Sequence, residues 1–388
     1  MRHNRLQKVP NSFWTLETLT SLDLSNNQLE GRLPQNVGKL NKLRELGVEG
    51  NQLTELPESV GDLHELEILR VDNNQLRALP STIGNLRRLK TLSAHSNQIA
   101  ELPTSFGFLT GLLTVDLKKN NLHATGNAFL ALTSVKYIDL RENKLEIFPT
   151  LPENNTCLDQ LFLGFNSIKQ VPEDVILSAK ESLTVLDIRD NKLQHLSDRL
   201  PQLYRLKTLD LTNNDLHDLP AGLGYLKYLN HLLVEGNPLR SIRSSIISSG
   251  TEPLKKYLRT RGGPPYLRVR KNSLTTDAID AMFAAGSRPG VCSYLKELDL
   301  RNNLITDVPQ KLQFLEVIDT LLLSFNRIQV LDGFSWSSMQ KLSVLSISDN
   351  RLESLGTVYQ APMLTSLSLE NNELRQNLRF VEASGHFT

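Results

Sequence analysis

Cysteine is scarce in this sequence, whose 388 residues include only Cys157 and Cys292, far apart and outside any CxxC pair. This scarcity excludes a disulfide framework and a thiolate zinc site, and it favours a reducing compartment. The sequence also lacks a run of about 18 apolar residues and an apolar signal segment after Met1. We therefore expect a soluble protein without a membrane span, located in the cytoplasm or the nucleus.

A large excess of charge of one sign is also missing. Lysine and arginine total 43 and aspartate and glutamate total 42, which gives a formal net charge of +1. This balance argues against a chain that binds nucleic acid or membranes along its whole length. Aromatic residues make up only 6% of the sequence, so the core is expected to consist of aliphatic side chains, mainly leucine.

Signatures of catalysis are absent as well. The sequence contains no G-x-x-x-x-G-K-[ST], G-x-G-x-x-G, H-E-x-x-H or G-x-S-x-G motif. His195 and His217 have no flanking carboxylates that would complete a metal site, and they are interpreted as exposed loop residues. Cys157 has no recognisable base partner. We predict a protein that is not an enzyme and that needs no cofactor and no metal.

The dominant feature is an internal repeat, L-x-x-L-x-L-x-x-N-x-L, which is the leucine-rich repeat signature. Its asparagines are spaced 22 to 25 residues apart except between 237 and 303, where the spacing is irregular. The asparagine positions are 4, 27, 51, 74, 97, 120, 143, 166, 191, 214, 237, 272, 303, 326, 350 and 372.

This spacing predicts an α/β solenoid. Leucines that alternate with polar residues predict short strands with one buried face, stacked in parallel on a concave side, and each asparagine is expected to bond backbone groups of its turn. The returning Leu-Pro-x-x-h-Gly segments predict short helices or 3₁₀ turns on the convex side, with a longer helix near 175–180. The predicted domains are a repeat array at 1–239, a helical break at 240–266, and a continuing array at 267–388 with an irregular tail.

The break is predicted to contain two short helices that cover the open edge of the preceding repeats. Gly250 suits the position after the first helix, while Thr251 is expected to cap the second, with Pro253 in its first turn. Residues 240–271 hold nine lysines or arginines and one acid, Glu252. This basic segment is interpreted as a solvated face of an internal cap, with a contact to an acidic or phosphoinositide partner as the alternative, and no nucleic-acid partner is expected. Residues 273–286 are expected to form a further helix.

Repeats of 23 residues with the Leu-Pro-x-x-h-Gly segment resemble the intracellular leucine-rich repeat proteins of the Ras-suppressor and Ras-scaffold class. The run Gly-Asn-Pro-Leu-Arg-Ser-Ile-Arg at 236–243, followed by Lys-Tyr-Leu-Arg at 256–259, resembles the middle element of the leucine-rich repeat-containing protein 40 subfamily. This resemblance implies an intracellular interaction protein without a catalytic centre. The sequence begins inside a repeat and ends without a closing repeat and second cap, so we expect a fragment, a splice product or a faulty gene model, whose uncapped ends would allow self-association.

Parallel strands place equivalent positions of successive repeats about 4.8 Å apart, so their exposed residues form columns. In one column, aspartates surround a single phenylalanine, and the next column carries basic residues. We predict a partner-binding site on the concave face, formed by Asp116, Lys118, Tyr137, Asp139, Arg141, Phe162, Asp187, Arg189 and Asp210.

The alternative interpretation is that these aspartates only solubilise the face by pairing with the basic column, and that Phe165, like Phe325, packs inside its turn. A second, smaller candidate site is Leu322 with nearby Arg301.

The resulting functional hypothesis is a scaffold or adaptor in intracellular signalling that binds a protein partner on the concave face. The alternative hypothesis is the recognition region of a larger signalling enzyme, such as a kinase, GTPase or ubiquitin ligase, whose catalytic domain lies outside these residues.

Overall fold

A computed structural model describes residues 1–153, 156–270, 272–284 and 294–374. The chain divides into two compact units, Met1–Lys255 and Lys256–Thr388. The division falls inside the predicted break. Cys292 and the tail from 376 lie outside the described residues.

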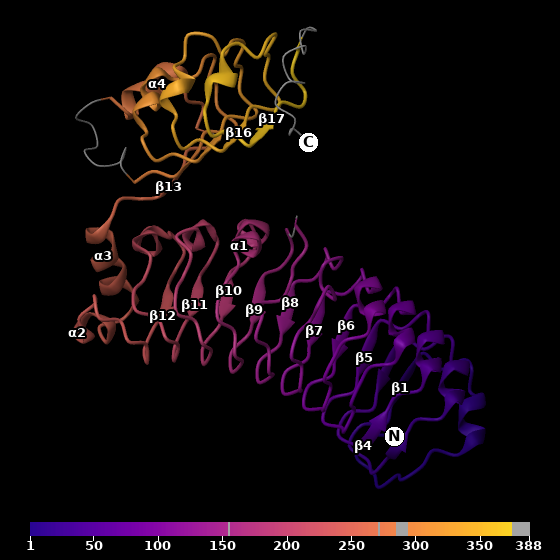
Figure 1. Cartoon of the computed structure of the whole chain (residues 1–388). Helices are drawn as coiled ribbons and strands as arrows, with labels where there is room; N and C mark the ends of the chain where they lie inside the picture. The colour runs from indigo at the N-terminus through magenta and orange to yellow at the C-terminus, as the bar shows by residue number, and fades with distance from the viewer. Residues whose placement is uncertain (154–155, 271, 285–293, 375–388) are drawn as a thin grey trace. The chain divides into compact units, whose positions relative to one another are not determined.

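The first unit is built on a parallel sheet of ten three-residue strands, as the α/β solenoid prediction requires (Figure 1). Each strand follows its neighbour in sequence without a shift in register, and the central aliphatic residue of each faces the core. The strands, in sheet order, are β1 (Ser21–Asp23), β3 (Glu45–Gly47), β5 (Ile68–Arg70), β6 (Thr91–Ser93), β7 (Thr114–Asp116), β8 (Tyr137–Asp139), β9 (Gln160–Phe162), β10 (Val185–Asp187), β11 (Thr208–Asp210) and β12 (His231–Leu233). The short strands β2 (Glu30–Arg32) and β4 (Gln52–Glu55) pair separately.

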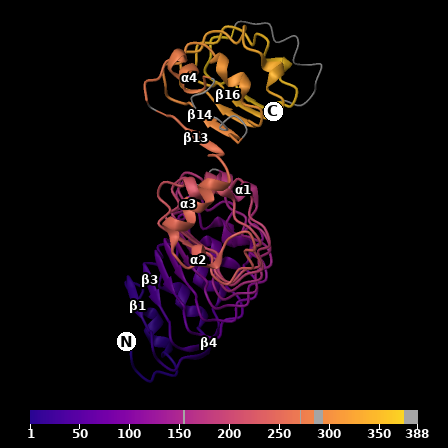
Figure 2. The same cartoon turned by 90° about the vertical axis from the view of Figure 1, so that its left-hand side faces the viewer.

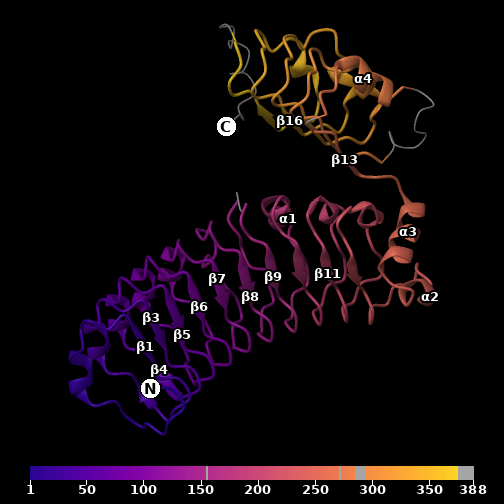
Figure 3. The same ribbon diagram turned by 180° about the vertical axis from the view of Figure 1, so that it is seen from behind.

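Short 3₁₀ helices and one α-helix lie where the chain returns from one strand to the next, opposite the sheet (Figure 3). We call this the return side of the unit. A proline lies directly before η1 to η5, α1 and η7, which confirms the prediction from the Leu-Pro segments. The elements are η1 (Asn11–Thr15), η2 (Gln35–Lys39), η3 (Glu58–Asp62), η4 (Ser81–Asn85), η5 (Thr104–Phe108), α1 (Glu173–Ala179), η6 (Leu200–Gln202) and η7 (Ala221–Tyr225).

The repeat asparagines form a continuous hydrogen-bonded ladder, which confirms the role predicted for them. Asn120 is typical: its Nδ2 donates to the carbonyl oxygens of Ala94 and Leu117 at 3.0 Å, and its Oδ1 accepts from the backbone N–H of Ile99 at 3.0 Å. Each asparagine thus joins its own turn to the preceding coil. The same bonds recur from Asn27 to Asn237 and again from Asn303 to Asn372.

Two short helices follow β12, as predicted for the break, and the second begins in the first unit and ends in the second (Figure 2). They are α2 (Ser244–Ile247) and α3 (Thr251–Arg261), and Gly250 between them has a left-handed φ of +95°. The predicted role of Thr251 is wrong, because α3 begins at Thr251 itself, and the Thr251 hydroxyl instead accepts the backbone N–H of Leu232 on β12 at 2.9 Å. One backbone N–H of this edge strand is thereby satisfied.

The basic segment at 240–271 is not one solvated face. The side chain of Lys255 is buried, and its ammonium donates to the carbonyl oxygen of Leu229 at 3.0 Å and to Glu252 at 3.1 Å. Arg268 and Arg270, by contrast, belong to the first strand region of the second unit. The basic residues therefore serve separate local structures.

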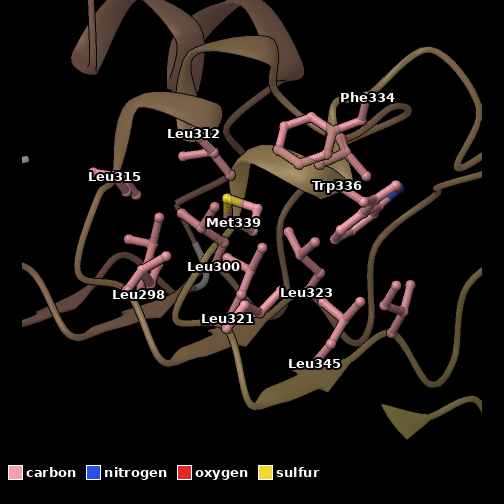
Figure 4. Packing of buried hydrophobic residues seen from close by; sticks show 14 of the residues in the cluster. Leu298, Leu300, Leu312, Leu315, Leu321, Leu323, Phe334, Trp336, Met339 and Leu345 are labelled. Carbon is pink, nitrogen blue, oxygen red and sulfur yellow. The ribbon is translucent and has the colours of Figure 1, made fainter. Parts of the chain in front are cut away.

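The second unit repeats the architecture with five parallel strands. Its core is aliphatic around one large aromatic pair, and Trp336 is fully buried with its Nε1 donating to the carbonyl oxygen of Leu331 at 3.1 Å (Figure 4). Its elements are β13 (Tyr266–Arg268), α4 (Thr276–Met282), β14 (Glu297–Asp299), η9 (Gln310–Phe314), β15 (Thr320–Leu322), η10 (Trp336–Ser338), β16 (Val344–Ser346), η11 (Val358–Gln360) and β17 (Ser366–Ser368). Among the described residues, no helix is both long and apolar enough to span a bilayer.

Candidate partner-binding face of the first unit

Five neighbouring strands, β7 to β11, bring the predicted site residues onto one face of the sheet. Phe162 pairs in register with Asp139 on one side and with Asp187 on the other. Asp116 and Asp210 extend the same column in the two directions. The column predicted from the repeat spacing is therefore continuous in space, and we call the surface over β7 to β11 the strand face.

Two aromatic rings form the centre of the strand face. The rings of Tyr137 and Phe162 lie 5.4 Å apart between centroids, and both side chains are half-buried. The guanidinium of Arg141 lies over the Phe162 ring, with its Cζ 4.8 Å from the centroid. The aromatic pair and this arginine present one contiguous, partly exposed surface.

Buried carboxylates hold the arginines of the strand face in place. The Nε of Arg141 donates to Asp139 Oδ1 at 3.0 Å, and its Nη2 lies 2.5 Å from Oδ2. Arg189 lies between two acids, with its Nε 3.6 Å from Asp187 and its Nη1 3.8 Å from Asp210. The hydrogen bonds of Arg141 fix its guanidinium group before any partner arrives, which lowers the entropy cost of binding. The contacts of Arg189 are longer than hydrogen bonds and place its guanidinium between the two acids without fixing it.

A glycine makes room for one of these arginines. A Cβ at Gly164 would lie only 3.1 Å from Cγ of Arg189 and 3.1 Å from Oδ1 of Asp187. The equivalent positions of the two preceding repeats carry Lys118 and Arg141. Because Gly164 has no side chain, the Arg189 side chain can extend over the backbone that follows β9.

The exposure of the predicted aspartates differs from the expectation. Asp139 is 1%, Asp187 5% and Asp210 8% exposed, so these carboxylates cannot form a charged rim that touches a partner directly. Their pairing with the basic column agrees with the alternative interpretation. Their effect is to orient Arg141 and Arg189, whose side chains remain 24% and 36% exposed.

The alternative interpretation of Phe165 is wrong. Phe165 and Phe325 are 46% and 52% exposed, and their backbones are left-handed, with φ of +58° and +57°. A bulky residue in this backbone conformation lowers the stability of the fold by about 1–2 kcal/mol. Because the rings are exposed, packing in the core does not offset this cost. The guanidinium of Arg189 lies over Phe165 at 5.4 Å, so this ring extends the strand face at its turn edge.

The second predicted site does not have the expected form. Leu322 is only 8% exposed, and Arg301 is bonded to Asp299. Leu322 thus contributes little apolar surface to a partner.

The strand face continues at β5 and β6 with residues on or just after these strands that the predicted site left out, Asp72, Ser93 and His95. The hydroxyl of Ser93 donates to Asp72 at 2.5 Å, and the backbone N–H of His95 donates to the same carboxylate oxygen at 2.9 Å. The repeat spacing already places Ser93 in the same column as Phe162, although the predicted site did not include it. Among the described residues, no group of three or more acidic, histidine or cysteine side chains is arranged to hold a metal ion.

Burial also shifts the acid–base properties of the strand face. Burial raises the pKa of Asp116 above its usual range, and the negative charges of Asp139 and Asp72 act in the same direction. Burial likewise raises the pKa of Asp187 and, together with Asp139 and Asp116, that of the Tyr137 phenol. The ionised form of Asp116 is therefore less favourable in the folded unit than in the unfolded chain.

We predict that Asp116→Asn raises the melting temperature at pH 7 and flattens its pH dependence. Because the folded pKa is raised, the folded state binds the proton more tightly, so the wild type gains stability as the pH falls through that pKa and loses it as the pH rises. The amide keeps an oxygen for the Lys118 backbone N–H, which now donates at 3.0 Å. Thermal unfolding from pH 4 to pH 7, with the exposed Asp215→Asn as control, measures this; a variant less stable at every pH contradicts it.

Comparisons with known proteins agree with this architecture. A sequence model described as "Leucine-rich repeat region" matches residues 4–112, one described as "Leucine rich repeat" matches 181–239 and 316–374, and a third, "Leucine Rich repeat", matches 291–308. Fibromodulin of Sus scrofa is 31% identical over 153 residues, which cover 39% of this chain and 89% of that protein. Fibromodulin of Bos taurus is 29% identical over 239 residues, covering 54% of this chain and 57% of that protein.

Solved structures share the fold across nearly the whole chain. A leucine-rich repeat protein of Leptospira interrogans is 26% identical with a TM-score of 0.53, covering 95% of this chain and 88% of its own. The plant peptide hormone receptor RGFR1, solved in complex with RGF2, is 23% identical with a TM-score of 0.56, covering 95% of this chain and 61% of its own.

Proposed function

Because the chain belongs to the leucine-rich repeat family, whose fold generally serves protein–protein interaction, we propose that it is a non-catalytic scaffold or adaptor that holds a protein partner on the strand face of its first unit. The observation that carries this proposal is the half-buried pair Tyr137 and Phe162, beside Arg141, which is hydrogen-bonded to the buried Asp139. Aromatic and arginine side chains contribute most of the binding energy at protein interfaces.

The strand face has the layered composition of an interface. Its aromatic centre is apolar, Arg141 is oriented in advance by Asp139, and Asp116 and Lys118 lie on and just after the neighbouring strand β7. A protein partner gains apolar contact at the centre and charge-assisted hydrogen bonds around it. The structure of RGFR1 with RGF2 supports the proposal in general terms, because there a protein of the same fold is in complex with another molecule.

A role in intracellular signalling is part of the proposal. It is supported by the scarcity of cysteine and by the resemblance of residues 236–259 to the middle element of the leucine-rich repeat-containing protein 40 subfamily. Within this proposal the protein acts in the cytoplasm or the nucleus and assembles partners without transforming a substrate.

We expect Phe162→Asp to weaken partner binding by about 30-fold, because loss of a central aromatic contact costs about 2 kcal/mol. Because the new aspartate lies directly between Asp139 and Asp187 and adds a like charge to the column, circular dichroism and thermal unfolding first check that the variant is folded. The full chain and its Phe162→Asp variant are used as baits in a cytosolic extract, captured proteins are identified by mass spectrometry, and the affinity of each is then measured.

The matched control is Phe108→Asp, which changes a 55% exposed phenylalanine on the return side of the same unit. A partner lost with Phe162→Asp and kept with Phe108→Asp supports the strand face as the binding site. If both variants capture the same proteins as the wild type, the partner binds elsewhere.

A further inference from the structure

The outward-facing residues of the ten-stranded sheet carry an excess of negative charge. The first and third residues of each strand face outward, because the central residue packs into the core, and the alternation continues to the residue two positions after the strand. We call these thirty positions the extended face. They hold nine acids and four lysines or arginines, a net charge of −5 with histidine neutral. The acids are Asp23, Glu45, Glu49, Asp72, Asp116, Asp139, Asp187, Asp210 and Glu235, and the bases are Arg70, Lys118, Arg141 and Arg189.

The excess does not depend on where the limits of the face are drawn. Adding the residue before each strand and the residue three positions after it raises the totals to 13 acids and nine lysines or arginines, a net charge of −4. Two of the added residues neutralise each other, since Nζ of Lys90 lies 2.6 Å from Oε2 of Glu67. The whole chain has a net charge of +1, so acid is concentrated on this face.

Two arginines of the extended face are each shared between two acids. Nη2 of Arg70 lies 3.8 Å from Glu45, and its Nε lies 3.8 Å from Glu49. Arg189 lies between the aspartates of β10 and β11 in the same way. Each of these arginines can neutralise one acid and leaves the charge of a second.

Two acids near the aromatic centre have no lysine or arginine beside them. Among the described residues, Asp72 has an ion-pair contact only with His95, at 3.7 Å, and Asp116 has none with a lysine or arginine. Burial raises the pKa of Asp116, and the charges of Asp139 and Asp72 act in the same direction. A cation supplied by a partner would relieve this repulsion.

These acids lie at regular intervals from the aromatic centre. In sheet order, Phe162 lies on β9, Asp116 two strands away on β7, Asp72 directly after β5, two strands further, and Asp23 on β1, two strands further again. Asp23 also forms no ion pair among the described residues, although the charge of Arg2 acts on it. Two strand spacings are about 9.6 Å. In a polyproline II chain, every third side chain points the same way, about 9.3 Å apart.

We propose that the occupant of the extended face is an extended segment of a partner protein in which lysines or arginines lie three and six positions from an apolar residue. This inference rests on the proposed function, since it names the chemistry of the partner at the same site. The apolar side chain lies on Tyr137 and Phe162, and the basic side chains lie on Asp116 and Asp72. An acidic segment would meet like charge, and a free polyamine would leave the aromatic pair uncovered.

The proposal is tested by fluorescence anisotropy with the full chain and labelled synthetic peptides. The basic probes are Leu-Pro-Pro-Lys-Pro-Pro-Lys-Pro-Pro-Lys and its reverse, because the columns do not fix the direction of the segment. The acidic probes carry glutamate in place of lysine, and a spacing probe has the basic composition with its lysines adjacent. A basic probe is expected to bind saturably, about tenfold more tightly than its acidic counterpart and the spacing probe, and more weakly at high salt.

The Asp72→Asn, Asp116→Asn double variant is expected to bind the basic probe about fivefold more weakly than the wild type. Asparagine keeps an oxygen for the hydrogen bonds that these carboxylates accept from Ser93, His95 and Lys118. The matched control is the Asp174→Asn, Asp215→Asn double variant, which removes the same charge from exposed positions of the first unit outside the extended face. Circular dichroism and thermal unfolding check that both variants fold.

The inference is overturned if no basic probe binds saturably, if basic, acidic and spacing probes bind equally, or if the two double variants bind equally. Its failure is distinguishable from failure of the proposed function, which is tested by protein capture with Phe162→Asp and Phe108→Asp. A protein lost only with Phe162→Asp, together with basic probes that do not bind, would keep the strand face as a binding site and exclude a basic segment as its occupant.

Discussion

Replacing Asn120 by alanine is expected to destabilise the first unit by about 3–5 kcal/mol. The Asn120 side chain is 6% exposed and bonds the backbone of Ala94, Leu117 and Ile99. Alanine cannot replace any of these bonds, and each buried backbone group left without a partner costs about 1–3 kcal/mol. Urea unfolding followed by circular dichroism measures the change in the free energy of unfolding.

The control for Asn120→Ala is Gln98→Ala, which also removes an amide in the same unit but from an exposed side chain. We expect this control to change the free energy of unfolding by less than about 0.5 kcal/mol. Equal effects of the two substitutions would mean that the asparagine ladder contributes no more than an ordinary surface amide.

Replacing Asp299 by alanine is expected to destabilise the second unit by about 3–5 kcal/mol. The carboxylate is fully buried beneath Arg268, Arg270 and Arg301, and its loss leaves three partly buried guanidinium groups close together without that carboxylate. Repulsion and incomplete solvation then both oppose folding. Urea unfolding of the full chain, carried out in a Trp14→Phe background so that fluorescence reports Trp336 in the core of this unit, measures the effect.

The control for Asp299→Ala is Glu316→Ala, which removes one negative charge from an exposed position of the second unit. If Asp299→Ala and Glu316→Ala shift the transition equally, the carboxylate does not hold the arginines in the folded unit. High salt provides a further check, because it should recover part of the stability that repulsion removes.

Much of the fold follows from the spacing of the repeat. The asparagine positions locate every turn of the ladder, including Asn4, whose coil supplies the Met1 carbonyl oxygen to Asn27, and Asn272, whose coil supplies that of Val269 to Asn303. The reason is physical: a constant spacing places identical residues at identical positions of successive coils, so in-register parallel pairing satisfies all of them together.

The candidate site could be predicted only in part. The columns that contain Phe162 and Arg141 follow from spacing, but the burial of Asp139 depends on how the neighbouring side chains pack over it. The role of Thr251 escaped prediction for the same reason, since its hydroxyl bonds a strand nineteen residues earlier instead of its own helix. Arg268 could have been found by counting back from Asn272, because Leu-Arg-Val-Arg alternates as the other strands do.

The asparagine ladder also has a mechanical consequence. Each rung joins one coil to the coil before it, so a coil inside the stack is held on both sides and a coil at the end of a ladder on one side only. Under a stretching force, coils should therefore peel away one by one from the ladder ends, and those near the middle should yield last. One ladder ends at Asn237 and another begins at Asn272. Each unit is therefore expected to unfold independently under force, with its own series of unfolding steps in a force–extension curve.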